Sequence, residues 1–93
     1  MSYSVYKYEV PVGEHVDIEL PQGAEILSVQ TQNDQPCIWA LVDKRAPMER
    51  RKFRIAGTGH SIDNPNALTF IGTFQMHGGS LVFHLFEYGR NNE

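Results

Sequence analysis

The residues best suited to chemistry stand together in "RKFRIAGTGH", residues 51–60, where a basic, strand-like run leads into Gly57, Thr58, Gly59 and His60. Glycines that follow a strand can adopt positive φ and present backbone N–H groups to an anion. Arginine can hold phosphate or carboxylate through two parallel hydrogen bonds. Lysine and arginine also protect edge strands from unwanted pairing, and isolated glycines often mark a tight turn or bulge. The stretch therefore predicts either an anion-binding loop or a charged edge strand that ends in a turn.

Charge is unevenly distributed along the chain. The whole protein carries a net charge of −3, but residues 43–54 hold six basic and two acidic residues, a local net charge of +4. The remaining 81 residues hold two basic and nine acidic residues, a net charge of −7. This distribution argues against binding of long nucleic acid and favours a local site for an anionic ligand or an acidic partner surface.

We combine the basic segment and the glycine loop into one candidate ligand site, completed by an aromatic side chain that stacks on a base. Strand alternation places Arg54 on the same face as Arg50 and Lys52, so we expect Arg54 to point outward and Arg54→Ala to weaken ligand binding without harming the fold. The candidate site residues are Lys44, Arg45, Arg50, Arg51, Arg54, Gly57, Thr58, Gly59, His60 and Trp39.

Signatures of catalysis, metal binding and cofactor binding are missing from the sequence. There is no phosphate-loop or dinucleotide-binding motif and no Gly-x-Ser-x-Gly element. The four histidines lack the spacing of a local metal site, which leaves open only a zinc site assembled through space. We expect His77 to be exposed, His84 to be a hydrogen-bonded core or interface residue, and Cys37 to be a buried small apolar residue. No metal, cofactor or catalytic residue is predicted.

Apolar and polar residues alternate with a period of two along most of the chain, which is typical of β-strands. The last strand is apolar on both faces, so we expect it to be central between two packed layers or covered by another subunit. "HGGS" predicts a two-residue primed turn at Gly78–Gly79. The predicted strands are 3–10, 15–20, 25–32, 37–42, 51–56, 68–76 and 80–88. This pattern predicts an all-β domain, a small antiparallel β-sandwich or open barrel of about seven strands.

A chain of 93 residues makes one domain, here 1–93, with a frayed tail expected from about residue 89. No apolar run is long enough to span a bilayer, and the first residues do not resemble a signal peptide. A single cysteine allows no internal disulfide. These features predict a cytoplasmic protein. A domain of this size gains stability by self-association, so we also expect a homo-oligomer.

Three stretches carry a resemblance to known proteins: "GAEILSVQTQNDQPCIWALVD", "FRIAGTGHSI" and "FIGTFQMHGGSLVFHLFE". With them the chain resembles a family of short, uncharacterised proteins of bacteriophages and prophages, over roughly residues 6–87. The resemblance implies a phage origin, hence the cytoplasm of an infected bacterium, and a small single domain. It implies no catalytic residues.

Small phage proteins of this kind often act by binding. By analogy, we expect a non-enzymatic anti-defence sponge that sequesters an anionic, nucleotide-type immune signal near a subunit boundary. One alternative is a protein-binding inhibitor of a host defence complex, which predicts a flat exposed patch and no pocket. Others are a small phosphodiesterase that uses His60 with a second histidine, and a purely structural virion protein.

Overall fold

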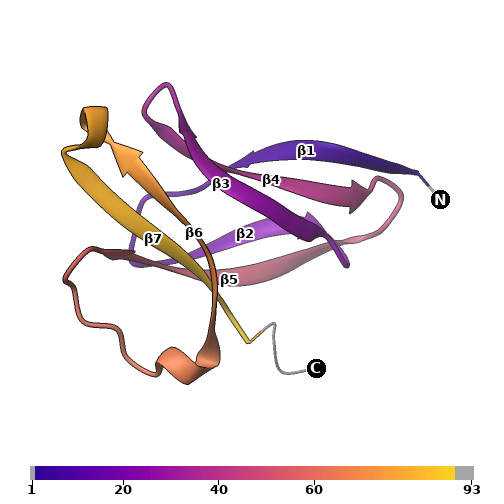
Figure 1. Ribbon diagram of the computed structural model, residues 1–93. Coiled ribbons are helices and arrows are strands. Elements are labelled where there is room, and N and C mark those ends of the chain that lie inside the picture. Colours follow the sequence, from indigo (N-terminus) through magenta and orange to yellow (C-terminus); the bar gives the residue numbers. More distant parts are fainter. Residues whose placement is uncertain (1, 90–93) are drawn as a thin grey trace.

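The computed structural model describes residues 2–89, which form seven β-strands and two short 3₁₀ turns. The strands make two antiparallel sheets, one of three strands in the order β1-β4-β3 and one of four strands in the order β2-β5-β7-β6 (Figure 1). The elements are β1 (Tyr3–Glu9), β2 (His15–Pro21), β3 (Glu25–Gln32), β4 (Gln35–Asp43), β5 (Met48–Gly57), η1 (Pro65–Ala67), β6 (Leu68–Met76), η2 (His77–Gly79) and β7 (Leu81–Tyr88).

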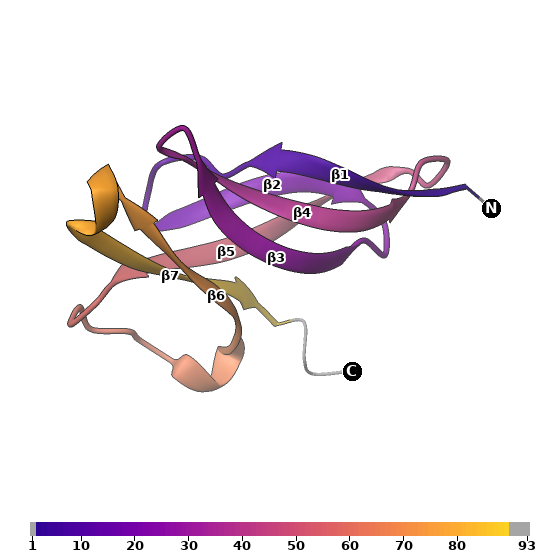
Figure 2. The same cartoon turned by 45° about the horizontal axis from the view of Figure 1, so that its top comes forward.

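The predicted fold class is confirmed: the protein is all-β, with seven strands in two antiparallel sheets and no closed barrel. The three-stranded sheet lies over the four-stranded sheet (Figure 2). The connection between β5 and β6 extends outward beside the four-stranded sheet. β7 lies between β5 and β6, as its apolar sequence predicts. Arg90 and the residues after it, most of the predicted tail, lie outside the described residues.

The core fills the space between the two sheets, because each strand turns alternate apolar side chains inward. β2 follows the pattern most plainly, with Val16, Ile18 and Leu20 buried and the residues between them exposed. Phe53 of β5 and Leu85 of β7 are completely buried at the centre. This inward face includes Phe53 and Ile55, as predicted from the alternation in β5.

The hairpin turns show one confirmed prediction and one that is wrong. "NDQP" predicts a turn over residues 33–36, and its first half is confirmed, because Asn33 and Asp34 both adopt positive φ between the paired residues Gln32 and Gln35, as in a type I′ hairpin. Gln35 and Pro36 already belong to β4. The predicted two-residue turn at Gly78–Gly79 is wrong, because the β6–β7 ladder closes at Met76 and Leu81 and leaves residues 77–80 as the turn. His77 itself takes a positive φ of 53° there.

No helix within residues 2–89 has the length and hydropathy that crossing a membrane requires. The cytoplasmic location therefore stays a prediction.

Candidate functional site

The sequence-predicted site does not assemble as one surface, because its arginines separate to different sides of β5. Arg51 points between the sheets and is 6% exposed, and its guanidinium pairs with Glu87 of β7 through Nε–Oε2 at 2.7 Å and Nη2–Oε1 at 3.0 Å. Nη1 also donates to the carbonyl of Ala24. A guanidinium with these bonds inside the sandwich joins β7 to the β2–β3 turn and cannot reach a ligand at the surface.

The expected exposure of Arg54 is wrong. Alternation does place it on the face of Arg50 and Lys52, but Arg54 is only 7% exposed. Its guanidinium donates to the carbonyl oxygens of Ile55 at 2.5 Å and Ser61 at 3.1 Å. Arg54 therefore fastens the start of the 58–67 connection to β5 through Ser61.

The remaining basic residues are exposed but lie near acidic side chains or far from the glycine turn. Arg50 lies 3.6 Å from the carboxylate of Glu19, and Lys52 pairs with Asp17 in the β2–β5 register. Lys44 and Arg45 are exposed in the β4–β5 turn, at the opposite end of the sandwich (Figure 1). Cross-strand carboxylates reduce the positive potential that an anion would feel.

Trp39 is also separate from the turn. It lies at the middle of β4, half-buried on the face away from the core, between Lys7 of β1 and Ser28 of β3. The stacking role predicted for it would need a ligand on the outer face of the three-stranded sheet.

"GTGH" forms a tight turn, in which the N–H of His60 donates to the carbonyl of Gly57 at 3.0 Å. Gly59 has a φ of 90° at the third position, which suits the glycine of a type II turn. The N–H of Thr58 donates to the carbonyl of Val82 at 3.2 Å. Because two of the turn's N–H groups are bonded within the protein, few remain for an anion.

The absence of a side chain at Gly57 allows the His60 ring to pack closely against the backbone. A Cβ on Gly57 would lie 3.0–3.4 Å from three atoms of that imidazole, so only glycine lets the ring lie this close to the backbone. Thr58 is held as well, because its hydroxyl lies 2.7 Å from Nε2 of His84, whose Nδ1 lies 2.9 Å from the hydroxyl of Thr73. The hydrogen bonds predicted for His84 are confirmed, but its expected place in the core is wrong, because it is half-buried on the face of β7 opposite to the buried Leu85. Its two bonds fix the turn to β6 and β7.

His60 and Gly57 line an apolar cavity of about 430 Å³ at one end of the sandwich, which we call the end cavity. Its walls come from the β1–β2 connection, the end of β5, and the β6–β7 hairpin. The lining residues are Pro11, Val12, Gly13, Glu14, Pro36, Ile55, Gly57, His60, Phe74, Met76, His77, Leu81 and Phe83. Phe74 and Phe83 stack with ring centroids 5.7 Å apart, which gives the cavity an aromatic wall.

His77 enters the same cavity from the β6–β7 turn. Asp34 of the β3–β4 turn accepts from the backbone N–H of His77 at 2.7 Å, and its second oxygen lies 3.1 Å from Nδ1. Because a carboxylate only accepts, Nδ1 of His77 carries the proton of this contact, and Nε2 is not engaged by Asp34. His77 is exposed, as predicted, but no sequence pattern pointed to Asp34 as its partner.

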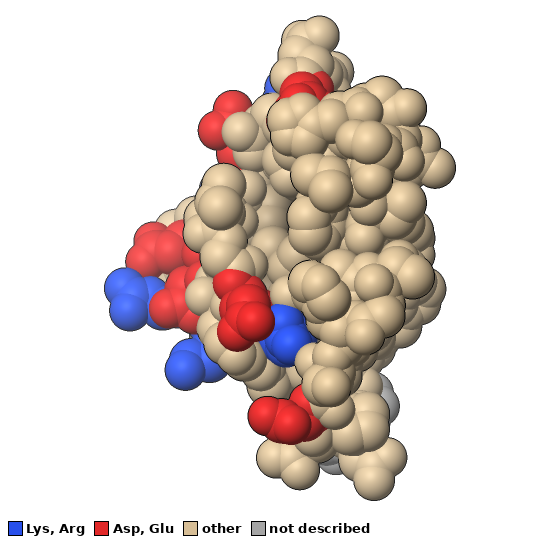
Figure 3. All heavy atoms as spheres, turned by 90° about the vertical axis from the view of Figure 1, so that its left-hand side faces the viewer, with Lys and Arg blue, Asp and Glu red and all other residues tan. Residues whose placement is uncertain are grey.

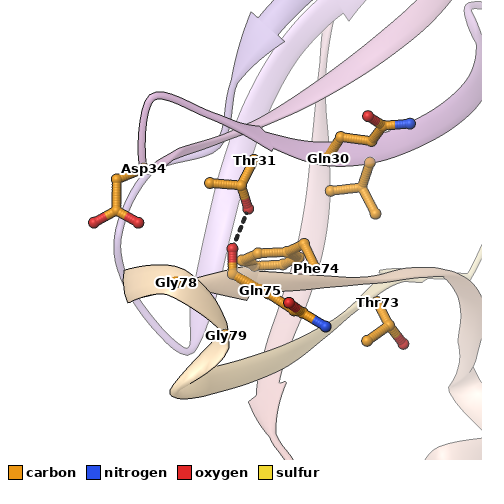
Figure 4. Close-up of a pocket in the computed structure, with 9 residues that line it drawn as sticks. Gln30, Thr31, Asp34, Thr73, Phe74, Gln75, Gly78 and Gly79 are labelled. Atoms are coloured by element: carbon orange, nitrogen blue, oxygen red, sulfur yellow. Dashed lines mark hydrogen bonds between the residues drawn. The ribbon is translucent and has the colours of Figure 1, made fainter.

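A second, more polar depression of about 520 Å³ adjoins this region at the seam between β3 and β6. Figure 4 shows Gln30, Asp34, Gln75 and the Gly78–Gly79 turn around it, with the Thr31 hydroxyl donating to the carbonyl of Gln75 at 2.5 Å. Asp34 lines this side pocket while it holds His77. The Asp34–His77 pair therefore stands between the two depressions.

The end of the molecule that carries the end cavity is poor in charge. In Figure 3, which faces this end, most of the surface lacks charged side chains, and the Lys and Arg groups in the lower middle and at the left margin lie near Asp and Glu. No cluster of three or more potential metal ligands occurs within residues 2–89. The chemistry of this end is thus that of an apolar cleft with two imidazoles.

Cys37 is buried as predicted, and burial raises the pKa of its thiol, while nearby Lys7 lowers this pKa and nearby Glu9 raises it further.

The chain belongs to a protein family defined by a domain of unknown function, DUF7352, whose model matches residues 1–93. No curated protein and no solved structure matches it. The family description names neither a source nor an activity, so the phage or prophage origin stays a prediction.

Proposed function

We propose that this protein is a non-enzymatic binding protein whose ligand enters the end cavity. The single observation that carries this proposal is the cavity itself. Its volume of about 430 Å³ falls in the range of small-molecule sites, and its lining has the usual composition of such sites, mostly apolar with a few polar groups.

We further propose that the ligand is nucleotide-type and that the protein sequesters it. A planar base suits a cavity with the aromatic side chain of Phe83 in its wall. The imidazoles of His60 and His77 supply ring nitrogens for polar atoms of the base or sugar. Because Arg51 and Arg54 are engaged inside the protein, the ligand's phosphates would remain toward solvent near the Gly57–His60 turn.

The test is a thermal-shift screen of the protein against cyclic dinucleotides, cyclic trinucleotides and ADP-ribose derivatives, followed by analysis of each ligand for breakdown. A ligand that binds only the native state raises the melting temperature, and recovery of intact ligand indicates sequestration. Degraded ligand would instead support the phosphodiesterase alternative. No shift with any compound would contradict the nucleotide form and favour the protein-binding inhibitor.

Two variants locate the site. His60→Ala removes an exposed ring from the end cavity and should abolish most of the ligand-induced shift, while the melting temperature without ligand stays close to that of the parent. Arg45→Ala removes an exposed charge from the opposite end and should bind ligand like the parent. Loss of the ligand-induced shift in Arg45→Ala but not in His60→Ala would indicate instead that the ligand binds the basic segment.

A further inference from the structure

The edge of β1 differs from the other three exposed edges of the two sheets. β3 and β6 each contain a register shift, between Ile26 and Ser28 and between Phe70 and Gly72. β2 ends at Pro21 and presents acidic side chains outward. Bulges, proline and charges are the devices that keep an edge strand from pairing with another chain. β1 has neither a bulge nor a proline, its two charges, Lys7 and Glu9, are opposite in sign, and its register with β4 is unbroken from Tyr3 to Glu9.

The ladder between β1 and β4 shows which backbone groups of β1 face the open edge. Val10 N–H donates to the carbonyl of Pro36, and Lys44 N–H donates to the carbonyl of Ser2. In an antiparallel pair, residues that exchange hydrogen bonds alternate with residues that do not. Even-numbered residues of β1 therefore bond to β4, and the N–H and C=O groups of Val5 and Lys7 point away from it. Within residues 2–89, no second strand pairs with that edge.

The side chains of β1 are unusually apolar for an exposed edge. Val5 is 53% exposed on the outer face and Tyr6 is 45% exposed on the inner face. The charges of the strand, Lys7 and Glu9, cancel, although the chain as a whole carries −3. A neutral, apolar edge on an acidic protein is a place where two copies can meet without strong repulsion.

We propose that β1 pairs with β1 of a second copy of this chain in an antiparallel, two-fold symmetric dimer, which joins the two three-stranded sheets into one six-stranded sheet. Centring the pair on Tyr6 places Val5 opposite Lys7 of the second copy, and the open-edge groups of both residues then exchange hydrogen bonds. Tyr6 meets Tyr6 of the second copy as a cross-strand aromatic pair. Centring on Lys7 would bring two ammonium groups face to face, which disfavours that register.

Analytical ultracentrifugation of the full chain tests the dimer, and a pair of substitutions at one position tests its register. Val5→Lys puts like charges opposite each other at two symmetric places and should weaken dimerisation about tenfold. Val5→Glu removes the same apolar side chain but faces Lys7 of the second copy, so it should dimerise at least as well as the parent. Val12→Lys, at an almost fully exposed position outside the strand, controls for added charge and should dimerise like the parent in the absence of ligand.

Amide hydrogen exchange gives a second measurement that needs no variant. The N–H groups of Val5 and Lys7 should become more protected as protein concentration rises, while those of Tyr6 and Tyr8, already bonded to β4, should change little. A parent protein that remains monomeric, or Val5 and Lys7 amides that exchange equally fast at every concentration, would overturn the proposal. Equal loss of dimer in Val5→Lys and Val5→Glu would overturn the register centred on Tyr6.

Discussion

The basic half of β5, residues 50–54, and the turn after it, residues 57–60, adjoin in the chain but meet different surroundings. In the basic half, Arg51 lies between the sheets and Arg54 donates to Ser61 of the 58–67 connection, so both guanidinium groups hold parts of the fold together. In the turn, the backbone is closed on itself and the His60 ring is left facing a cavity. The two buried arginines of this segment therefore stabilise the fold, while the uncharged turn lines the candidate site.

The sharpest test of the structural half is the buried ion pair. Glu87→Gln leaves the Arg51 guanidinium inside the sandwich without its counter-charge, and we expect a loss of about 3–5 kcal/mol of unfolding free energy. Glu19→Gln removes the acid from the exposed Arg50 pair, whose side chains are 66% and 60% exposed, and should cost less than about 1 kcal/mol. Urea denaturation measures both. Equal losses would mean that the burial of Arg51 does not matter to stability.

Arg54 tests whether a guanidinium fastens the loop. Arg54→Met keeps much of the apolar stem but removes the bonds to the Ile55 and Ser61 carbonyls, so we expect a loss of about 1.5–3 kcal/mol. Hydrogen exchange should also speed up in residues 58–67. Lys52→Met, on the same face but exposed, is the matched control and should change neither quantity. An unchanged loop in Arg54→Met would show that other contacts hold it.

Substitutions of the two glycines of the turn distinguish a steric effect at Gly57 from a backbone-conformation effect at Gly59. Gly59→Ala forces an L-residue to a φ of 90° with no atom nearby, and should cost about 1 kcal/mol or more through strain alone. Gly57→Ala should cost a similar or smaller amount, about 1 kcal/mol, because its Cβ pushes on the His60 ring instead. NMR shifts of the His60 ring distinguish them, since only Gly57→Ala should displace the ring directly. An unmoved ring in Gly57→Ala would remove the argument that Gly57 sets its position.

The smallest expected effect is at Cys37 of β4, which lies outside residues 50–54 and 57–60. It serves as a reference, because it is a buried group with no role in the candidate site. Burial raises its pKa above the ordinary value of 9.0, so the thiolate fraction at pH 8 is lower than in an unfolded chain. We expect alkylation in the folded protein to be at least about tenfold slower than in guanidinium, and to speed up as pH rises. Equal rates in the two states would contradict burial of the thiol.

The strand content was predictable because alternation is local. β1, β2, β3 and β6 begin within a residue of where the period-two pattern predicts, and β4 and β5 are longer than predicted by a few residues at their ends. Those extensions include Glu49 and Asp43, whose types do not favour strands and whose pairing comes from neighbouring strands. The η2 turn was mispredicted because His77 takes a positive φ while Asp34 accepts its N–H.

The candidate site was only partly predictable. The "GTGH" turn stood out in the sequence, and Gly57 and His60 do line the end cavity. His77 and Asp34 carried no pattern that links them, because their contact joins two hairpin turns 43 residues apart. Lys44, Arg45 and Arg50 were grouped with the turn by closeness in sequence, although an extended strand carries neighbours in sequence far apart in space.

The strands, the inward apolar faces and the turns at residues 33–34 and 57–60 follow from the sequence alone, because each depends on residues within a few positions of one another. Which charges are buried, and which histidines line the same cavity, depends on the tertiary structure. Arg51 pairs with Glu87, 36 residues away, and Arg54 is buried and bonded to Ser61 of the connection that follows its strand. Alternation gives the direction of a side chain, but its exposure depends on what the rest of the chain lays over that face.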